Sequence, residues 1–319
     1  MNHVLRLLLF IVLLSSYASL TADNSEYAAC AMNNGSHDIC PITDDKLDTS
    51  LDRVPERKAT WLSLLKSSPA ERRPGLAYIL MYMPLADLKV LPVDTVEANV
   101  ALAYQARTEV PWGATLPEDI FLDDVLPYAS LTEPRQSMRA EFHNHYLPLI
   151  KNYQSPVEAA LALNDVLFRD YKVTFNKHRL RNIQSSKENI TQGMATCTGL
   201  SIMLVEASRA VGIPARLAGI ESWPKRGGNH TWVEVWDKGW HFMAAGDNNP
   251  KGADHAWFKG LAAKAIDGSK HHGIYAASYR WTGQYFPLAW DKDWDKVSNV
   301  NAIEITGHYQ HYAFPGPGH

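Results

Sequence analysis

Residues 196–243 constrain the fold more than any other part of this 319-residue chain, because a helical pattern ends there and a strand pattern begins. Apolar residues recur at helical spacing after Thr196, which suits a helix N-cap. Gly212 suits the left-handed residue that ends a helix, and Pro214 prevents the helix from continuing. The pattern therefore predicts a helix over residues 197–211.

Strand signals follow this helix. Residues 215–220 form one candidate, and residues 231–236 alternate with the period of two that is typical of a strand. The tripeptide 237–239 predicts a tight turn with glycine in the left-handed position, and residues 240–243 return from it. Residues 253–266 look helical. Further strand candidates lie before the helix and after the hairpin, at residues 172–176, 275–281, 286–290 and 300–305. A helix packed on an antiparallel sheet gives an α+β core.

The rest of the chain divides by composition. Residues 51–166 combine helical spacing of apolar residues with many prolines, which predicts a subdomain of short helices. We expect the α+β core to span residues 167–309 and a short tail to follow over residues 310–319. Before the helices lie a polar segment at residues 23–50 and a different type of segment at residues 1–22.

The first 22 residues have the form of a secretory signal peptide. Arg6 precedes an unbroken apolar run over residues 7–14, and small residues at Ala18 and Ala22 suit cleavage. The run is too short to span a bilayer, so we expect an exported protein, periplasmic or extracellular, without a membrane anchor. A buried N-terminal helix is the alternative.

Charge excludes some partners. Charged residues make up 20% of the chain and the formal net charge is −3. This balance gives no reason to expect nucleic acid or an anionic membrane surface as a partner. It gives no indication of the oligomeric state.

The three cysteines divide into a pair and a single residue. In an oxidising compartment Cys30 and Cys40 are a natural disulfide pair across a short polar loop. Cys197 is then unpaired, and such a thiol is either reactive or buried and inert. It begins the predicted helix, where partial positive charge and free N–H groups stabilise a thiolate. Its own N–H is also placed to form half of an oxyanion hole.

A histidine and an acid belong at neighbouring strand ends. His230 directly precedes the predicted strand, and the hairpin register places it opposite Gly246. A one-residue bulge there would turn Asp247 toward His230, where a carboxylate fixes the imidazole tautomer and aims its other nitrogen at the sulfur. A surface histidine and a loop acid are the alternatives.

Three runs of sequence resemble the core of the transglutaminase-like superfamily: Ala-Thr-Cys-Thr-Gly-Leu-Ser at 195–201, Arg-Ala-Val-Gly-Ile-Pro-Ala-Arg at 209–216 and Gly-Asn-His-Thr-Trp-Val-Glu-Val-Trp at 228–236. The flanking runs resemble exported bacterial members of this superfamily, at residues 83–87, 124–128 and 300–309. The resemblance implies a papain-like α+β fold: a helix bearing the cysteine packed on an antiparallel sheet, here preceded by the helical subdomain. It also implies a catalytic triad of Cys197, His230 and Asp247.

The resemblance further implies a thiol-dependent amide hydrolase or acyl transferase, of protease, amidase or transglutaminase type, that works through a thioester. Its substrate would be a protein, a peptide or another amide. A non-catalytic binding protein on the same scaffold is the alternative. We expect no cofactor and no catalytic metal, since the paired histidines (143 and 145, 271 and 272) lack zinc-type spacing with cysteine or acid partners.

Other candidates have two readings each. Gln184 is either an oxyanion donor or a polar loop residue. Trp223, Trp232 and Trp236 line a groove or pack in the core. The helical subdomain is either a lid beside the groove or a buttress behind the sheet.

Overall fold

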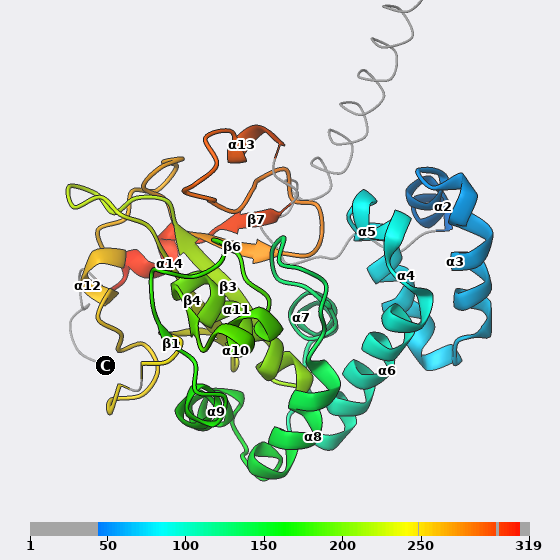
Figure 1. The fold of residues 1–319 in the computed structure, drawn as a ribbon, viewed down its shortest axis with the longest axis horizontal. Coiled ribbons are helices and arrows are strands. Elements are labelled where there is room, and N and C mark those ends of the chain that lie inside the picture. Colours follow the sequence, from blue (N-terminus) through cyan, green and yellow to red (C-terminus); the bar gives the residue numbers. More distant parts are fainter. Residues whose placement is uncertain (1–43, 248, 298–299, 313–319) are drawn as a thin grey trace, which may run out of the picture.

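The structure is a computed structural model that describes residues 44–247, 249–297 and 300–312 (Figure 1). The predicted signal peptide, Cys30 and Cys40 lie outside the described residues. Among the residues described, no helix is both long and apolar enough to cross a bilayer.

The first part of the described chain is helical and has its own core, with Trp61 and Tyr78 fully buried at its centre. It begins at Asp44, inside the segment that the sequence assigned to a polar stretch. Figure 1 shows the helices of residues 44–109, in blue and cyan, set to one side of the remaining chain. They are α2 (Asp44–Asp52), α3 (Pro55–Ser67), the 3-10 turn η1 (Ala70–Arg72), α4 (Arg73–Tyr82), α5 (Leu85–Val90), α6 (Val93–Glu109) and α7 (Glu118–Asp124).

Two later helices belong to the second core. Apolar side chains of α8 (Arg139–Ile150) and α9 (Pro156–Asp170) pack in one cluster with the sheet, as Phe142 and Leu163 illustrate. The sequence had grouped these helices with the subdomain over residues 51–166. Periodicity alone cannot decide which core an amphipathic helix faces.

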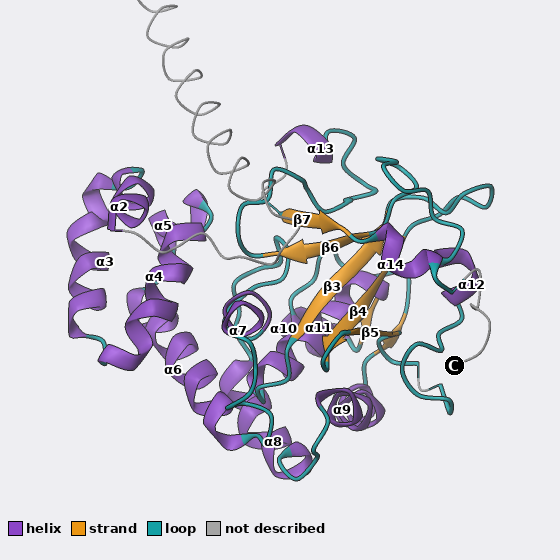
Figure 2. Cartoon of the chain, turned by 180° about the vertical axis from the view of Figure 1, so that it is seen from behind, coloured by secondary structure: helices purple, strands orange, loops and turns teal. Residues whose placement is uncertain are grey.

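The second core has three layers. Five strands in the order β5-β4-β3-β6-β7 form an antiparallel sheet (Figure 2). The long helix α11 (Cys197–Ala210) packs on one face, and α12 (Lys259–Ala262) and α14 (Thr306–Gln310) cover the other. The strands are β3 (Ala215–Ile220), β4 (His230–Trp236), β5 (Trp240–Met243), β6 (Tyr275–Ser278) and β7 (Asn301–Glu304). The remaining elements are β1 (Thr174–Phe175), which pairs in parallel with β2 (Met194–Ala195), α10 (Ser186–Gln192) and α13 (Trp294–Val297).

This arrangement confirms the predicted α+β fold. The helix begins at Cys197, and Gly212 follows its end with a φ of 78°. The hairpin register is also as predicted, since Val233 pairs with Met243. In the turn, however, the left-handed residue is Lys238 with a φ of 60°, and not the glycine that follows it.

Two predicted elements differ from the structure. Residues 253–266 contain only the short α12, because Asp254 pairs with the edge of β5 instead of entering a helix. Its N–H donates to the carbonyl of Phe242 at 2.9 Å, and its carboxylate accepts from the Phe242 N–H at 3.0 Å. Residues 286–290 form no strand: the Phe286 N–H donates to Val300, and the neighbouring Tyr285 makes only an isolated bridge to Asn301.

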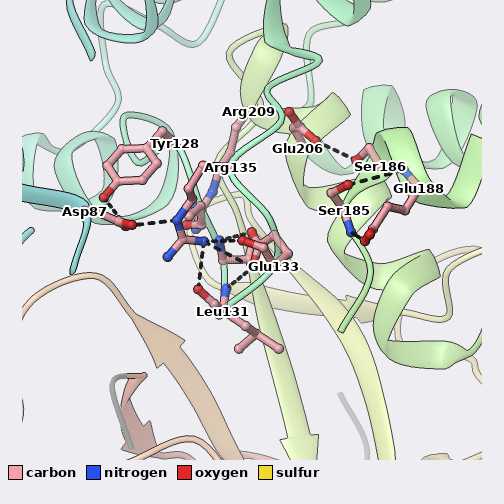
Figure 3. A network of polar contacts seen from close by, with 12 residues as sticks. Asp87, Tyr128, Leu131, Glu133, Arg135, Ser185, Ser186, Glu188, Glu206 and Arg209 are labelled. Atoms are coloured by element: carbon pink, nitrogen blue, oxygen red, sulfur yellow. Dashed lines mark hydrogen bonds and ion pairs between the residues drawn. The ribbon is translucent and has the colours of Figure 1, made fainter. Parts of the chain in front are cut away.

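A polar network joins the helical part to α11 (Figure 3). Asp87 accepts hydrogen bonds from the Tyr128 hydroxyl at 2.7 Å and from Arg135 at 2.9 Å. Further along the network, Glu206 of α11 accepts from the Met138 N–H at 2.6 Å. These bonds fix the orientation of α11 relative to the helices before it.

Candidate active site

Side-chain amides of two preceding residues, Asn189 and Gln184, stabilise the start of α11. The Asn189 amide donates to the carbonyl of Gly199 at 2.7 Å, and Gln184 donates to Asn189 at 3.0 Å and to the carbonyl of Met194 at 3.2 Å. A Cβ on Gly199 would lie 2.9 Å from the Asn189 oxygen, so glycine permits this close approach. Gln184 is buried and supports the helix start, which favours a structural role over that of an oxyanion donor.

Direct contacts join the first turn of α11 to the first residues of β4. The hydroxyls of Thr198 and Thr231 lie 3.1 Å apart, and the Ser201 hydroxyl donates to the carbonyl of Thr231 at 3.2 Å. Thr198 follows Cys197 and Thr231 follows His230. The contacts therefore bring the candidate nucleophile and the candidate base to the same end of the core.

A cleft of about 670 Å³ opens at this end, and Cys197, His230 and Asp247 all line it. Cys197 is partly buried there as a free thiol. The lining residues are Phe168, Val173, Thr174, Phe175, Lys177, Cys197, Leu200, Ser201, Arg226, Asn229, His230, Thr231, Ala244, Ala245, Gly246, Asp247 and Trp257. None of them precedes residue 168, so the helices before α9 do not line the cleft.

His230 lies among aromatic rings. It shares a sheet face with Trp232, since strand residues two apart point the same way, whereas Thr231 faces α11. Ring centroids lie 4.8 Å away for Trp257, 4.9 Å for Phe258 and 5.7 Å for Trp232. The His230 Nε2 atom is buried without a hydrogen-bond partner, and burial lowers the pKa of His230 to about 3. The imidazole is therefore neutral at physiological pH.

Asp247 lies at the rim, in a turn that follows β5. Gly246 has a φ of 73°, and the Asp247 N–H approaches the carbonyl of Ala244 at 3.4 Å. The buried Asn164 of α9 holds this turn: its amide donates to the Ala244 carbonyl at 3.0 Å and its oxygen accepts from the Gly246 N–H at 2.8 Å. The chain is thus irregular where the register required a bulge, and the Asp247 side chain is exposed.

The described residues contain no hydrogen bond between Cys197 and His230 or between His230 and Asp247. The direct bond that the register suggested for His230 and Asp247 is therefore not formed in this conformation. The two side chains point to different places: the His230 ring faces Trp232 and the neighbouring aromatic rings, whereas Asp247 is exposed at the rim of the cleft. The structure brings the three residues to one cleft without joining them.

Buried polar contacts give several residues of the run 228–236 a structural role. Trp232 donates to the Tyr309 hydroxyl at 2.7 Å, and that hydroxyl donates to Glu234 at 2.7 Å. Arg216 of β3 forms an ion pair with Glu234 at 2.8 Å and stacks on Trp240, with its guanidinium carbon 3.5 Å from the ring centroid. Trp232 is therefore a core residue and not part of a groove.

The other predicted tryptophans also pack inside or at the edge of the core. Trp223 is buried and stacks on Trp232 with ring centroids 6.1 Å apart, and Trp236 packs against Trp240. Trp257, which does line the cleft, was not among the tryptophans predicted from the sequence. The sequence offered no signal for this role, because the proximity of Trp257 to His230 depends on the tertiary structure.

Within the described part of the chain, no three His, Cys, Asp or Glu side chains are grouped so that they could hold a metal ion. The histidines at 271 and 143 instead pair singly with acids, Glu221 at 2.9 Å and Glu109 at 2.7 Å.

A helix that begins at a cysteine, packed on an antiparallel sheet in which β4 begins at a histidine, places this core in the papain-like class of α+β folds. Residues 146–245 match the family model of the transglutaminase-like superfamily, which confirms the resemblance of the sequence and identifies this segment as its core. A solved structure of a proposed cysteine protease from Cytophaga hutchinsonii is similar, with 17% identity and a TM-score of 0.34. The match covers 62% of this chain and 66% of that chain, just under two thirds of the neighbour's length. No curated protein matches the chain in sequence.

Proposed function

We propose that the protein is an exported thiol-dependent amide hydrolase or acyl transferase with Cys197 as nucleophile, His230 as general base and Asp247 as the orienting acid. The observation that carries the proposal is the convergence of all three on one cleft at the start of α11. The superfamily match over residues 146–245 supports the same chemistry.

In the proposed reaction, the Cys197 sulfur attacks the carbonyl carbon of a substrate amide while His230 takes up the thiol proton. The N–H groups at the start of α11 stabilise the oxyanion. The C–N bond then breaks, and His230 returns the proton to the leaving amine. Water or a second amine attacks the thioester and releases Cys197. Hydrolysis is our preference, because water is always available as the acceptor.

This chemistry requires a change in the position of His230. In the described conformation its ring packs on Trp257 and Phe258 and has no bond to the sulfur. Trp257 is 54% exposed, so the group that covers the ring on the cleft side can move with little loss of buried area. We propose that substrate binding displaces Trp257 and turns His230 toward Cys197.

The test is covalent capture. The full-length protein, incubated with a peptide thioester or an activated amide, should form an acyl adduct on Cys197 that intact-mass spectrometry detects and peptide mapping locates. Cys197→Ala should abolish the adduct, and His230→Ala should slow its formation by about 10²-fold or more, the usual contribution of a general base. Asp247→Asn should slow it by a smaller factor. Equal adduct formation in the wild type and His230→Ala would reject the assignment of the base.

A non-catalytic binding protein is the second candidate. The buried His230 Nε2 atom, which has no hydrogen-bond partner among the described residues, favours it. In that case the wild type forms no acyl adduct above the level of Cys197→Ala, yet both bind the same peptides with equal affinity.

Export is a separate part of the proposal and lies outside the described residues. The chain expressed with its own N-terminus should be recovered in mature form beginning at Ser19 or Asp23, as cleavage after Ala18 or Ala22 requires. N-terminal sequencing checks this, and mapping without reductant checks the disulfide between Cys30 and Cys40.

A further inference from the structure

Two of the chain segments that line the cleft are basic. Residues 172–181 form one lip and residues 223–230 form the other, and both contribute lining residues. Together they contain six lysines and arginines and no aspartate or glutamate. The whole chain has 31 basic and 34 acidic residues, so this is a local excess of positive charge.

Two of these cations are available to a ligand. Arg181 pairs with Glu188 at 3.1 Å, and Arg179 donates to the carbonyl of Lys177 at 2.8 Å. The Lys177 and Arg226 side chains line the cleft, are exposed, and form no ion pair with any described residue. An anion bound between them would gain charge interactions that the free protein lacks.

Acidic groups near the cleft do not cancel these cations. Asp247 is the one carboxylate among the described lining residues. Glu221 lies two residues before the second lip, but its carboxylate accepts a hydrogen bond from Trp294 at 2.9 Å and pairs with His271 at 2.9 Å. The lining therefore carries a net positive charge.

The cleft also presents exposed aromatic surface. Phe175 on the first lip is 57% exposed, and Trp257, which also lines the cleft, is 54% exposed. Arg226 lies over the Trp257 ring, with its guanidinium carbon 5.7 Å from the centroid, so the cationic and aromatic surfaces are continuous. Exposed aromatic rings at a concave site indicate contact with an apolar partner group.

We infer that the cleft selects an acidic polypeptide segment with an aromatic or large aliphatic side chain next to the reacting amide. The apolar side chain lies between Phe175 and Trp257, and a carboxylate of the same segment pairs with Lys177 and Arg226. The inference rests on the proposed function for the identity of the reacting bond, but the binding preference itself does not require catalysis.

Binding is therefore measured on the full-length Cys197→Ser variant, which cannot form a stable thioester. Three fluorescent peptides share one phenylalanine-containing sequence and differ only in two flanking positions, which are glutamate, glutamine or lysine. The glutamate peptide should bind about tenfold or more tighter than the lysine peptide, equivalent to about 1.4 kcal/mol. Its advantage should shrink at high salt, because these exposed charges are screened.

Two variants test the residues. Lys177→Glu with Arg226→Glu should reverse the order of the glutamate and lysine peptides, while Trp257→Ala should weaken all three by a similar factor. Lys151→Glu, at an exposed site on a different part of the surface, is the matched control and should change nothing. Circular dichroism confirms folding of each variant.

Equal binding of the three peptides, no measurable binding of any of them, or an unchanged order in the double variant would each overturn the inference. Selective binding together with no acyl adduct in the wild type would sustain the inference and reject the proposed catalysis. An acyl adduct without selectivity would do the reverse.

Discussion

At the scale of single residues, burial shifts the pKa values of two groups in opposite directions. His230 lies among aromatic rings and is kept neutral, with its pKa lowered to about 3 by desolvation. Glu206 lies in the network behind α11, and desolvation raises its pKa to about 7. In both cases the interior disfavours the charged form. The proposed base is thus neutral at physiological pH but weakly basic in this buried position, so it accepts a proton more readily once its ring leaves the aromatic surroundings.

The first prediction concerns His230 and acid. Its folded pKa is depressed, so its contribution to stability is complete above pH 6.5 and is lost as the pH falls toward 3. The limit of this loss is about 5 kcal/mol. His230→Gln should therefore lose less unfolding free energy between pH 6.5 and pH 4 than the wild type does, as measured by urea denaturation. NMR of the imidazole should show a neutral ring at pH 5, and an imidazolium signal there would contradict the prediction.

The second prediction concerns Glu206 and has the opposite sign. Its folded pKa is raised, so its contribution is complete below pH 4.5 and is lost as the pH rises through 7. We expect the unfolding free energy to fall by up to about 3 kcal/mol over this range. Glu206→Gln keeps an oxygen for the Met138 N–H and should remove this part of the pH dependence. Parallel pH curves for the wild type and Glu206→Gln would show that Glu206 is ionised throughout.

At the scale of elements, strand β4 is fixed by a buried charge. Glu234 has no exposed surface and joins β4 to Arg216 of β3 and to Tyr309 of α14. Because His230 is on the same face of the same strand, this network holds the sheet face on which the imidazole lies. The ion pair therefore serves the site through the position of β4.

The third prediction tests that network. Glu234→Ala leaves the buried Arg216 without its partner and should cost about 3–5 kcal/mol of unfolding free energy. Combining it with Arg216→Met should recover a large part of the loss, because an apolar pair removes the unpaired charge. Chemical denaturation of the two single variants and the double variant forms the cycle. Additive losses would mean that the two residues do not stabilise each other.

At the scale of the whole molecule, the helical part supports the core from the end opposite the cleft. Arg209, near the end of α11, donates to the carbonyls of Asp124 at 3.0 Å and Ala129 at 3.1 Å. Asp123 of α7 accepts from the Tyr78 hydroxyl at 2.9 Å and from the Tyr279 N–H at 2.8 Å. The cleft is at the other end of α11, where Cys197 begins the helix.

The fourth prediction tests whether the helical part stabilises the core without affecting access of peptides to the cleft. Asp123→Ala leaves several buried donors without an acceptor and should lower the unfolding free energy by about 3 kcal/mol or more. Asp119→Ala on the same helix should cost less than about 1 kcal/mol, since Asp119 interacts mainly with the helix dipole. Peptide affinity at the cleft should be unchanged in both folded variants. A change in affinity for Asp123→Ala would indicate that the helical part affects the cleft.

Local patterns were sufficient for the elements around the site. The helix from Cys197, the two central strands and the hairpin register depend on capping, period-two alternation and turn length, which neighbouring residues define. The predicted helix at 253–266 failed because Asp254 found a partner in β5. The strand predicted at 286–290 does not form, because pairing at a sheet edge depends on residues that are distant in the sequence.

The sequence by itself determined that a cysteine begins a helix, that a histidine begins the second strand after that helix, and that both belong to an α+β core. Only the tertiary structure decided that His230 turns to the aromatic face, that Asp247 stays at the rim, and that Trp257 covers the imidazole. It also decided that α8 and α9 pack with the sheet. The physical reason is range: caps and periodicity act over a few residues, whereas burial depends on side chains far apart in the chain.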